Sequence, residues 1–223
     1  MKRITVLLAE DHPIVRVGFR TLLKHERDIE VVGEAATGRQ AVALAKKLRP
    51  DVVVMDIAMP LLNGLEATRQ IRKALPGTKV LMLSAHNDDA YVDQAIASGA
   101  AGFLHKQTSS HDLSRAIREV QNGNTFFSPA IAKRLQDQKS PADSKLLRKR
   151  VAHLSSRELE VLQLIAEGRP NKQVADELGI SIKTVEKHRQ SMMQKLNIHD
   201  VAGLTRYAIG AGIIESSVQL TIV

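Results

Sequence analysis

Apolar and polar residues along the first 120 positions alternate between two spacings. Short apolar runs typical of buried strands occupy positions 4–9, 29–34, 51–55, 79–83 and 101–104. Between them, apolar residues recur at helical spacing over 14–24, 39–48, 65–74, 90–98 and 111–121. Regular alternation of strand and helix predicts right-handed crossovers and a parallel sheet with helices on both faces. We therefore expect an α/β, flavodoxin-like, doubly wound fold with a five-stranded parallel sheet, in a domain over residues 1–122.

The pattern changes after residue 122. Residues 123–152 contain turn and linker sequence, with a short helix that begins at Ser128 and a basic run at 145–150. We expect this segment to be a basic linker. The tail 216–223 alternates apolar residues without a helical period, and it is expected to be disordered or to add a strand to another surface.

Residues 153–215 have the pattern of a second, all-α domain with four helices. A capping box at Ser155 and Glu158 begins the first helix. Asn171, Ser181 and Asp200 are the expected caps of the other three helices. The second and third helices, 172–178 and 182–197, are joined by three residues, which predicts a helix-turn-helix.

Composition limits the class of protein. The chain has 223 residues, 43% of them hydrophobic, which is enough for two cores. It has no cysteine, which excludes a disulfide framework and a zinc ribbon. Its longest apolar runs are far shorter than a membrane span, so we expect a cytoplasmic protein.

The formal net charge of +8 suggests a polyanionic partner, but this charge is unevenly distributed. Residues 1–125 carry 17 basic and 14 acidic side chains, residues 126–150 carry 7 and 2, and residues 151–223 carry 8 and 8. The basic run at 145–150 is most simply a solvated linker. The helical third is neutral overall, so it could bind DNA only if its charges are segregated.

Two of the predicted strands are followed directly by acidic residues. Glu10 and Asp11 follow the run 4–9, and Asp56 follows the run 51–55. Open α/β sheets bind ligands at the carboxyl ends of their strands. If these two strands are neighbours, three carboxylates converge there, and like charges so close require a cation. An all-oxygen set favours Mg²⁺, beside which a carboxylate can accept a phosphoryl group.

Further residues complete a recognisable set at the strand ends. The set consists of Glu10, Asp11, Asp56, Met59, Pro60, Asn63, Gly64, Ser84, Ala85 and Lys106. It resembles the signature of response-regulator receiver domains. The stretches 154–162, 171–175, 181–188 and 195–196 resemble the LuxR-type DNA-binding domain. Together they cover nearly the whole chain, which is similar to the NarL/FixJ type of two-component response regulator.

The resemblance implies a role for each acidic residue. Asp56 would accept a phosphoryl group from the phosphohistidine of a cognate histidine kinase. Asp11, Asp56 and the backbone carbonyl of Ala58 would bind Mg²⁺ directly, and Glu10 would act through a metal-bound water. A helix cap is the simpler alternative for Asp11, because capping and metal binding use the same oxygens.

The resemblance also implies roles for residues on the last two strands. Lys106 and Ser84 would contact the phosphoryl oxygens, and Phe103 matches the switch aromatic of the family, although core packing alone would explain it. Phosphorylation would favour a homodimer on promoter DNA, with RNA polymerase as a further partner. This would make the chain a transcriptional regulator and not an enzyme.

The predicted helix 182–197 has two distinct faces. Val185, His188, Met192 and Leu196 recur at helical spacing and are expected to pack inward. Lys183, Lys187, Gln190 and Gln194 form the opposite face, which offers charges to phosphates and amides to base edges. With the family pattern, the predicted DNA contacts are Lys172, Lys183, Thr184, Glu186, Lys187, His188, Arg189, Gln190 and Gln194.

Three alternative functions fit parts of the pattern. A phosphatase with an aspartyl intermediate would carry a second Asp two residues after Asp56, where Ala58 stands. A flavodoxin-like flavin binder would have Ser, Thr and Gly after its first strand instead of Glu10 and Asp11. The complete acidic set with Ser84 and Lys106 argues against a regulator that binds DNA without phosphorylation.

Three histidines have no assigned role. His12, His105 and His111 are expected to be solvated side chains. His12 is close enough to the acidic pair to couple to it, and His105 stands where many related proteins carry an apolar residue.

Overall fold

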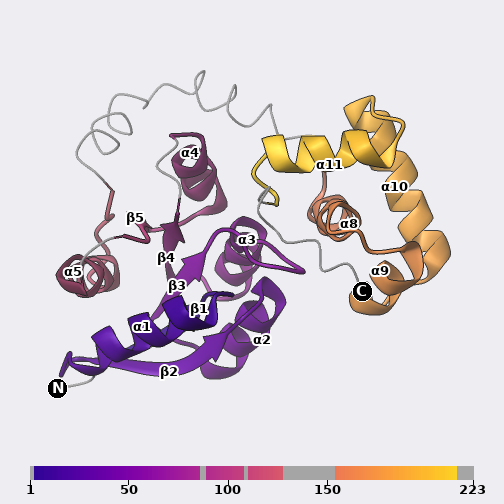
Figure 1. Cartoon of the computed structure of the whole chain (residues 1–223). Helices are drawn as coiled ribbons and strands as arrows, with labels where there is room; N and C mark the ends of the chain where they lie inside the picture. The colour runs from indigo at the N-terminus through magenta and orange to yellow at the C-terminus, as the bar shows by residue number, and fades with distance from the viewer. Residues whose placement is uncertain (1–2, 86–88, 108–109, 128–153, 215–223) are drawn as a thin grey trace. The chain divides into compact units, whose positions relative to one another are not determined.

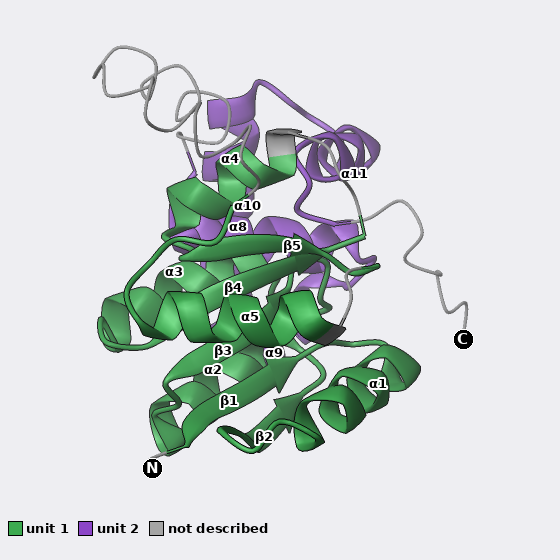
Figure 2. Ribbon diagram, turned by 90° about the vertical axis from the view of Figure 1, so that its left-hand side faces the viewer, with its two compact units in different colours: residues 1–141 green, residues 142–223 purple. Residues whose placement is uncertain are grey.

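The computed structural model describes residues 3–85, 89–107, 110–127 and 154–214 (Figure 1). The chain divides into two compact units, residues 1–141 and residues 142–223, coloured separately in Figure 2. The predicted helix that begins at Ser128, the basic run 145–150 and the tail 216–223 lie outside the described residues. No helix in the described part of the chain is long and apolar enough to cross a membrane.

The N-terminal unit is built on a five-stranded sheet in which every pair of neighbouring strands is parallel. The strands are β1 (Ile4–Ala9), β2 (Ile29–Ala35), β3 (Val52–Asp56), β4 (Lys79–Ser84) and β5 (Gly102–His105). Their order across the sheet is β2-β1-β3-β4-β5, so the direction of winding reverses between β1 and β3. This confirms the predicted flavodoxin-like, doubly wound fold, with each predicted strand boundary within one residue of its position in the structure.

Helices cover both faces of this sheet (Figure 2). They are α1 (Pro13–Lys24), α2 (Gly38–Leu48), α3 (Gly64–Ala74), α4 (Asp89–Ser98) and α5 (Ser110–Gln121). One core cluster joins the sheet to α2, α3 and α4, and the other joins it to α1 and α5. Because β3 is buried on both faces, its sequence is a continuous apolar run instead of an alternating one.

A side-chain lock fixes the register of β1 against β3. Asp51 Oδ2 accepts hydrogen bonds from Thr5 N at 2.9 Å and Thr5 Oγ1 at 2.7 Å, and Asp51 N donates to Thr5 Oγ1 at 2.9 Å. A shift by one residue would break all three bonds and move each side chain of the strand to the opposite core cluster. The lock therefore fixes how far the acidic residues after β1 lie from Asp56, at the end of β3.

The C-terminal unit is helical throughout its described residues. Its helices are α8 (Ser156–Ala166), α9 (Asn171–Leu178), α10 (Ile182–Leu196) and α11 (Val201–Gly210). Ser155 and Glu158 form the predicted capping box, and the side chains of Ser181 and Asp200 cap α10 and α11 as expected. Gly179, with φ of 61°, ends α9 and permits the tight turn into α10.

The predicted cap of α9 was wrong. Pro170 occupies the N-cap position, and Asn171 is the first residue of the helix. The Asn171 side chain instead accepts a hydrogen bond from Arg189 Nη1 on α10, at 2.7 Å. Asn171 therefore contacts another helix instead of capping its own. Its position in the sequence does not reveal this contact, because Arg189 is 18 residues away.

Glu158 joins α8 to α10 at a site where it is only 3% exposed. Its carboxylate accepts hydrogen bonds from Lys195 Nζ at 2.7 and 2.8 Å and from Ser191 Oγ at 2.7 Å. It also accepts one from the backbone N–H of Ser155 at 2.7 Å. Burial by itself raises the pKa of Glu158, but these hydrogen bonds lower it to about 2. The free-energy cost of burying this carboxylate is thus offset by its hydrogen bonds.

We expect Glu158→Gln to destabilise the C-terminal unit by roughly 2–3 kcal/mol at neutral pH, since the native fold favours the ionised carboxylate. Because the pKa is lowered, the stabilisation is present above the normal value of 4.5 and is lost as the pH falls toward 2. Hydrogen exchange of the α8 and α10 amides in the full chain measures the effect. Glu186→Gln, on the exposed side of α10, is the control, and equal protection in the two variants would contradict the prediction.

Candidate functional site

The structure brings the three predicted carboxylates together at the carboxyl edge of the sheet. One ligand atom from each of Glu10, Asp11, His12 and Asp56 can be chosen so that all four lie within 4.8 Å of one another. Asp56 is only 1% exposed and Glu10 only 2%. They meet because β1 and β3 are neighbours at the point where the winding reverses, the usual ligand position in such sheets.

Lys106, directly after β5, supplies the positive charge at this site. Its Nζ lies 2.8 Å from Asp56 Oδ2 and 3.0 Å from both carboxylate oxygens of Glu10. Although burial by itself lowers the pKa of Lys106, the carboxylates of Asp56 and Glu10 raise it above its usual value. The lysine therefore remains charged, and it pairs with Asp56 and Glu10, whereas the sequence predicted a contact of Lys106 with phosphoryl oxygens.

One ammonium cannot neutralise three carboxylates. Burial, and after it the charge of Glu10, raises the pKa of Asp56 from 3.8 to about 8, although Lys106 acts in the opposite direction. A carboxylate in this environment holds a proton at neutral pH unless a further cation is present.

The residues present fit a divalent metal ion. Glu10 Oε2, Asp11 Oδ1 and Asp56 Oδ2 are buried and receive no well-aligned hydrogen bond from the described residues, although Lys106 lies close to the first and the last. Such an all-oxygen, net-negative set suits Mg²⁺. Ala58 lies in the half-buried loop between β3 and α3, close to this cluster in sequence.

Gly64 explains how α3 begins so close to Asp56. A Cβ atom at this position would lie 1.9 Å from the backbone oxygen of Asp56, so only glycine allows the helix to start there. The Gly64 N–H donates to Ile57 O at 2.8 Å, which closes the loop that contains Ala58.

The remaining predicted residues, Ser84 and Phe103, lie at the end of β4 and within β5. Ser84 is the final residue of β4 and is buried, and its carbonyl accepts a hydrogen bond from Lys106 N at 2.7 Å. Phe103 on β5 is buried in the core cluster shared with α2, α3 and α4.

Two residues near the acidic pair were not predicted to have a role. Arg16 on α1 donates from Nη1 to the backbone oxygen of Glu10 at 2.6 Å and pairs through Nε with Glu34 on β2 at 3.2 Å. It therefore fixes the loop that carries Glu10 and Asp11. Nothing in the sequence indicates this contact, because Arg16 and Glu34 are distant along the chain.

His12 was expected to be a solvated side chain without a role, and it is 63% exposed. Its Nδ1 nevertheless lies 2.8 Å from Asp11 Oδ1 and 3.1 Å from Glu10 Oε1. Partial burial by itself lowers the pKa of His12, but these two carboxylates raise it above its usual value. The sequence signal was its position directly after the acidic pair.

The two faces of α10 are arranged as the helical spacing predicted. Val185 and Met192 are completely buried, and His188 and Leu196 are half-buried. The exposed members of the predicted DNA-contact set are Lys172, Lys183, Glu186, Lys187, Gln190 and Gln194. Thr184 and Arg189 are half-buried, and Thr184 Oγ1 bonds Ser181 Oγ at 2.8 Å at the start of the helix.

The positive charge of α10 is less freely available than its sequence suggests. Lys195, one of its four basic residues, pairs with Glu158 inside the C-terminal unit. Arg189 donates one hydrogen bond to Asn171 on α9. Lys183 and Lys187 are therefore the cations that the exposed face of this helix presents directly.

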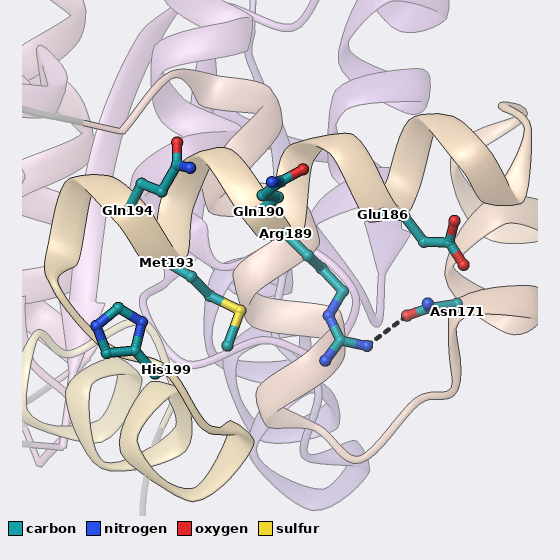
Figure 3. A pocket seen from close by; sticks show the side chains of 7 residues that line it. All are labelled: Asn171, Glu186, Arg189, Gln190, Met193, Gln194 and His199. Carbon is teal, nitrogen blue, oxygen red and sulfur yellow. Dashed lines mark hydrogen bonds between the residues drawn. The ribbon is translucent and has the colours of Figure 1, made fainter.

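A hollow of about 450 Å³ lies along one side of α10 (Figure 3). The helix contributes Glu186, Arg189, Gln190, Met193 and Gln194 to its lining. Asn171 and His199 lie toward its two ends, and Met193 supplies an apolar surface between them. The sequence indicated no role for Met193 or His199, because the position of His199 beside α10 depends on how the segment before α11 packs.

Comparison with known families divides the chain into two parts. Residues 6–118 match the family described as response regulator receiver domain, and residues 152–208 match the family described as bacterial regulatory proteins, luxR family.

Individual relatives match along nearly the whole chain. The response regulator protein VraR of Staphylococcus aureus is 37% identical over 95% of this chain and 99% of its own length. The structure of the RcsB response regulator of Salmonella typhimurium is 29% identical, with a TM-score of 0.60, over 95% of this chain and 99% of that one. A structure of two RcsB dimers bound to two parallel DNAs is 28% identical, with a TM-score of 0.55, over 92% and 98% of the two chains.

We expect the metal-free protein to lose stability as the pH rises from about 6 to about 9. The pKa of Asp56 in the folded state lies above its ordinary value of 3.8, so the folded state binds the proton more tightly and loses this advantage as the pH rises through about 8. The part due to Asp56 is on the order of 2 kcal/mol. Thermal unfolding in the presence of a chelator measures it.

The matched control is Asp56→Asn, which has no titrating carboxyl group at this position and should give a flatter pH curve. His12, whose pKa is also raised, is present in both proteins and cancels in the comparison. Saturating Mg²⁺ should also flatten the wild-type curve, since the cation replaces the proton. Parallel curves for the wild type and Asp56→Asn would show that the carboxylate cluster does not control this dependence.

Proposed function

We propose a mechanism for this chain, which belongs to the two-component response regulators that join a receiver domain to a LuxR-type DNA-binding domain. It is a DNA-binding transcriptional regulator of a two-component system. We propose that Asp56 is its phosphoacceptor. The observation that carries this assignment is the position of Asp56 at the end of β3, buried within 2.8 Å of Lys106 and beside Glu10 and Asp11.

In the proposed reaction, a carboxylate oxygen of Asp56 attacks the phosphorus of the kinase phosphohistidine. The O–P bond forms as the P–N bond breaks, leaving an acyl phosphate on Asp56 and, because the phosphohistidine ring reacts in its protonated form, a neutral imidazole on the kinase. Lys106 is placed to pair with the phosphoryl oxygens as negative charge develops on them. Because Lys106 Nζ already lies 2.8 Å from the Asp56 carboxylate, little reorganisation of the lysine is needed when the donor arrives.

The proposed metal ligands are Asp11, Asp56 and the backbone carbonyl of Ala58, with Glu10 acting through a bound water. Bound Mg²⁺ would supply the charge that keeps Asp56 ionised and would offset charge on the phosphoryl group. The buried oxygens that lack well-aligned hydrogen bonds support this assignment. Asp11 lies within 4.8 Å of the other candidate ligand atoms, and no side chain caps α1, which favours metal binding over the helix-cap alternative.

We propose that Ser84 donates its hydroxyl to the phosphoryl group after transfer and that Phe103 responds as the switch aromatic. The burial of Ser84 at the end of β4, joined to Lys106 through the backbone, supports a shared role. Phe103 is buried two residues before His105 on the adjacent strand, where a shift at the end of β4 would reach it.

The proposed domains are a receiver over residues 1–122, a basic linker over 123–152, a DNA-binding domain over 153–215 and a tail over 216–223. The two family matches, which end at 118 and begin at 152, support a linker between them.

In the DNA-binding domain, we place α10 in the major groove as the second helix of the helix-turn-helix. Lys187, Gln190 and Glu186 would face base edges, and the exposure of all three supports this. The remaining predicted contacts, to phosphate or at the edge of the interface, are Lys172, Lys183, Thr184, His188, Arg189 and Gln194.

We further propose that phosphorylation favours a homodimer, which RNA polymerase would encounter on the promoter. One helix-turn-helix contacts only a few base pairs, and two-fold pairing about doubles the contacts. The RcsB dimers bound to DNA provide a precedent among related proteins.

Phosphorylation can be tested with acetyl phosphate as a small-molecule donor. In the presence of Mg²⁺, we expect intact-mass analysis to show uptake of one phosphoryl group, about 80 Da, by the wild type and none by Asp56→Asn. Asp112→Asn, at a half-exposed carboxylate on α5, is the control and should behave like the wild type. Equal uptake by Asp56→Asn would assign the phosphoacceptor to another residue.

Phosphate contacts and base contacts of the DNA-binding domain can be distinguished by how their loss affects binding to specific and random DNA. Lys183→Ala should weaken binding to specific and random DNA alike and reduce the salt slope by about one. Gln190→Ala should cost roughly 1–3 kcal/mol on the selected site only, because it removes a base contact. Binding titrations at several salt concentrations, on a selected and a scrambled site, distinguish the two effects.

Both variants should remain folded, since both side chains are exposed, whereas Val185→Asp would bury an unpaired charge and should unfold the domain. A folded Val185→Asp protein together with an unfolded Lys187→Ala protein would show that α10 faces the other way.

A further inference from the structure

We propose that His105 is a positioning residue for phosphoryl binding. Its imidazole joins the loop after β4 to the loop after β5, so that Ser84 and Lys106 contact the phosphoryl group as one rigid pair. This inference rests on the proposed phosphorylation of Asp56. His105 was expected to be a solvated histidine without a role, but its ring contacts in the structure are specific.

The ring lies between two backbone groups. His105 Nε2 is 2.8 Å from Ala85 O, and His105 Nδ1 is 3.2 Å from Gln107 N. Ser84 and His105 are paired in the parallel register of β4 and β5, and Lys106 N donates to Ser84 O at 2.7 Å beside them. The side chain therefore adds two bonds just where the backbone ladder of the sheet ends.

The two partners determine the protonation of the ring. A backbone carbonyl can only accept a hydrogen bond, so the nitrogen facing Ala85 must carry the proton. A backbone N–H can only donate, so the nitrogen facing Gln107 must be unprotonated. His105 is thus a neutral ring with its proton on Nε2, and one ring orientation satisfies both loops.

The location of these bonds gives them a functional consequence. Ala85 directly follows Ser84, and Gln107 directly follows Lys106, so each bond anchors the neighbour of a proposed phosphoryl contact. Two groups that must reach one phosphoryl group benefit from fixed spacing, because small displacements strongly weaken such contacts. His105 acts through these neighbours and does not itself touch the phosphoryl group.

Two amide variants separate the two bonds. In His105→Gln, the amide nitrogen lies about where Nε2 does, so it can still donate to Ala85 but offers no acceptor near Gln107. In His105→Asn, the amide oxygen lies about where Nδ1 does, so it can still accept from Gln107 but cannot reach Ala85. Each variant loses one hydrogen bond, so a purely structural role predicts similar effects for both.

The test uses the full chain with saturating Mg²⁺ and beryllofluoride as the phosphoryl mimic, whose bound state is followed by fluorine NMR. We expect His105→Asn to weaken beryllofluoride binding by about 5- to 10-fold, because Ala85, the neighbour of Ser84, is no longer tied to the loop that carries Lys106. His105→Gln should stay within about twofold of the wild type. Mg²⁺ affinity should be unchanged in both variants, because the proposed metal ligands lie on β1, β3 and the loops after them.

Equal weakening in the two variants, or none in His105→Asn, would overturn the positioning role, and so would a loss of Mg²⁺ affinity that parallels the loss of beryllofluoride binding. If the wild type itself bound no beryllofluoride, the proposed phosphorylation of Asp56 would fail, and this inference with it. Wild-type binding combined with equal variants would overturn the role of His105 alone.

Discussion

The acidic cluster of the N-terminal unit holds more buried negative charge than Lys106 can neutralise, and the proposed phosphoacceptor site depends on this imbalance. Glu10 and Asp56 are almost fully buried, Asp11 lies beside them, and Lys106 is held between the first two. In a low-dielectric site, such charges must bind a proton or a cation. The fold supports this unfavourable cluster through contacts elsewhere, including the Arg16 bond to the loop that carries the acidic pair.

The same sheet that creates the cluster also controls its geometry. The Thr5–Asp51 lock sets the register of β1 against β3, and Gly64 lets α3 begin against the backbone of Asp56. On the other side, the ends of β4 and β5 are joined by the backbone bond from Lys106 to Ser84. Asp56 is paired with Leu83 in the register of β3 and β4, so Asp56 and Ser84 are held close together on adjacent strands.

The C-terminal unit separates its positive and negative side chains in space. Its residues are neutral overall from 151 to 223, and yet α10 presents an exposed face with two lysines. The buried Glu158 pairs with Lys195, so Lys195 is directed toward α8 while Lys183 and Lys187 remain on the exposed face. One ion pair thus orients α10 against α8 and leaves the exposed face to the side chains that are proposed to contact DNA.

The sequence by itself determined the elements and their chemistry, because these depend on local spacing. Apolar runs predicted the strands, and helical periodicity predicted that Val185 is buried. The position of Asp56 directly after an apolar run predicted that its carboxylate lies at the carboxyl end of a buried strand. Only the tertiary structure decided which distant groups meet. It gave Asn171 to Arg189 instead of a helix cap and held the His105 ring between two loops. Such contacts depend on packing distances of a few ångströms between elements, and no periodicity along the chain records them.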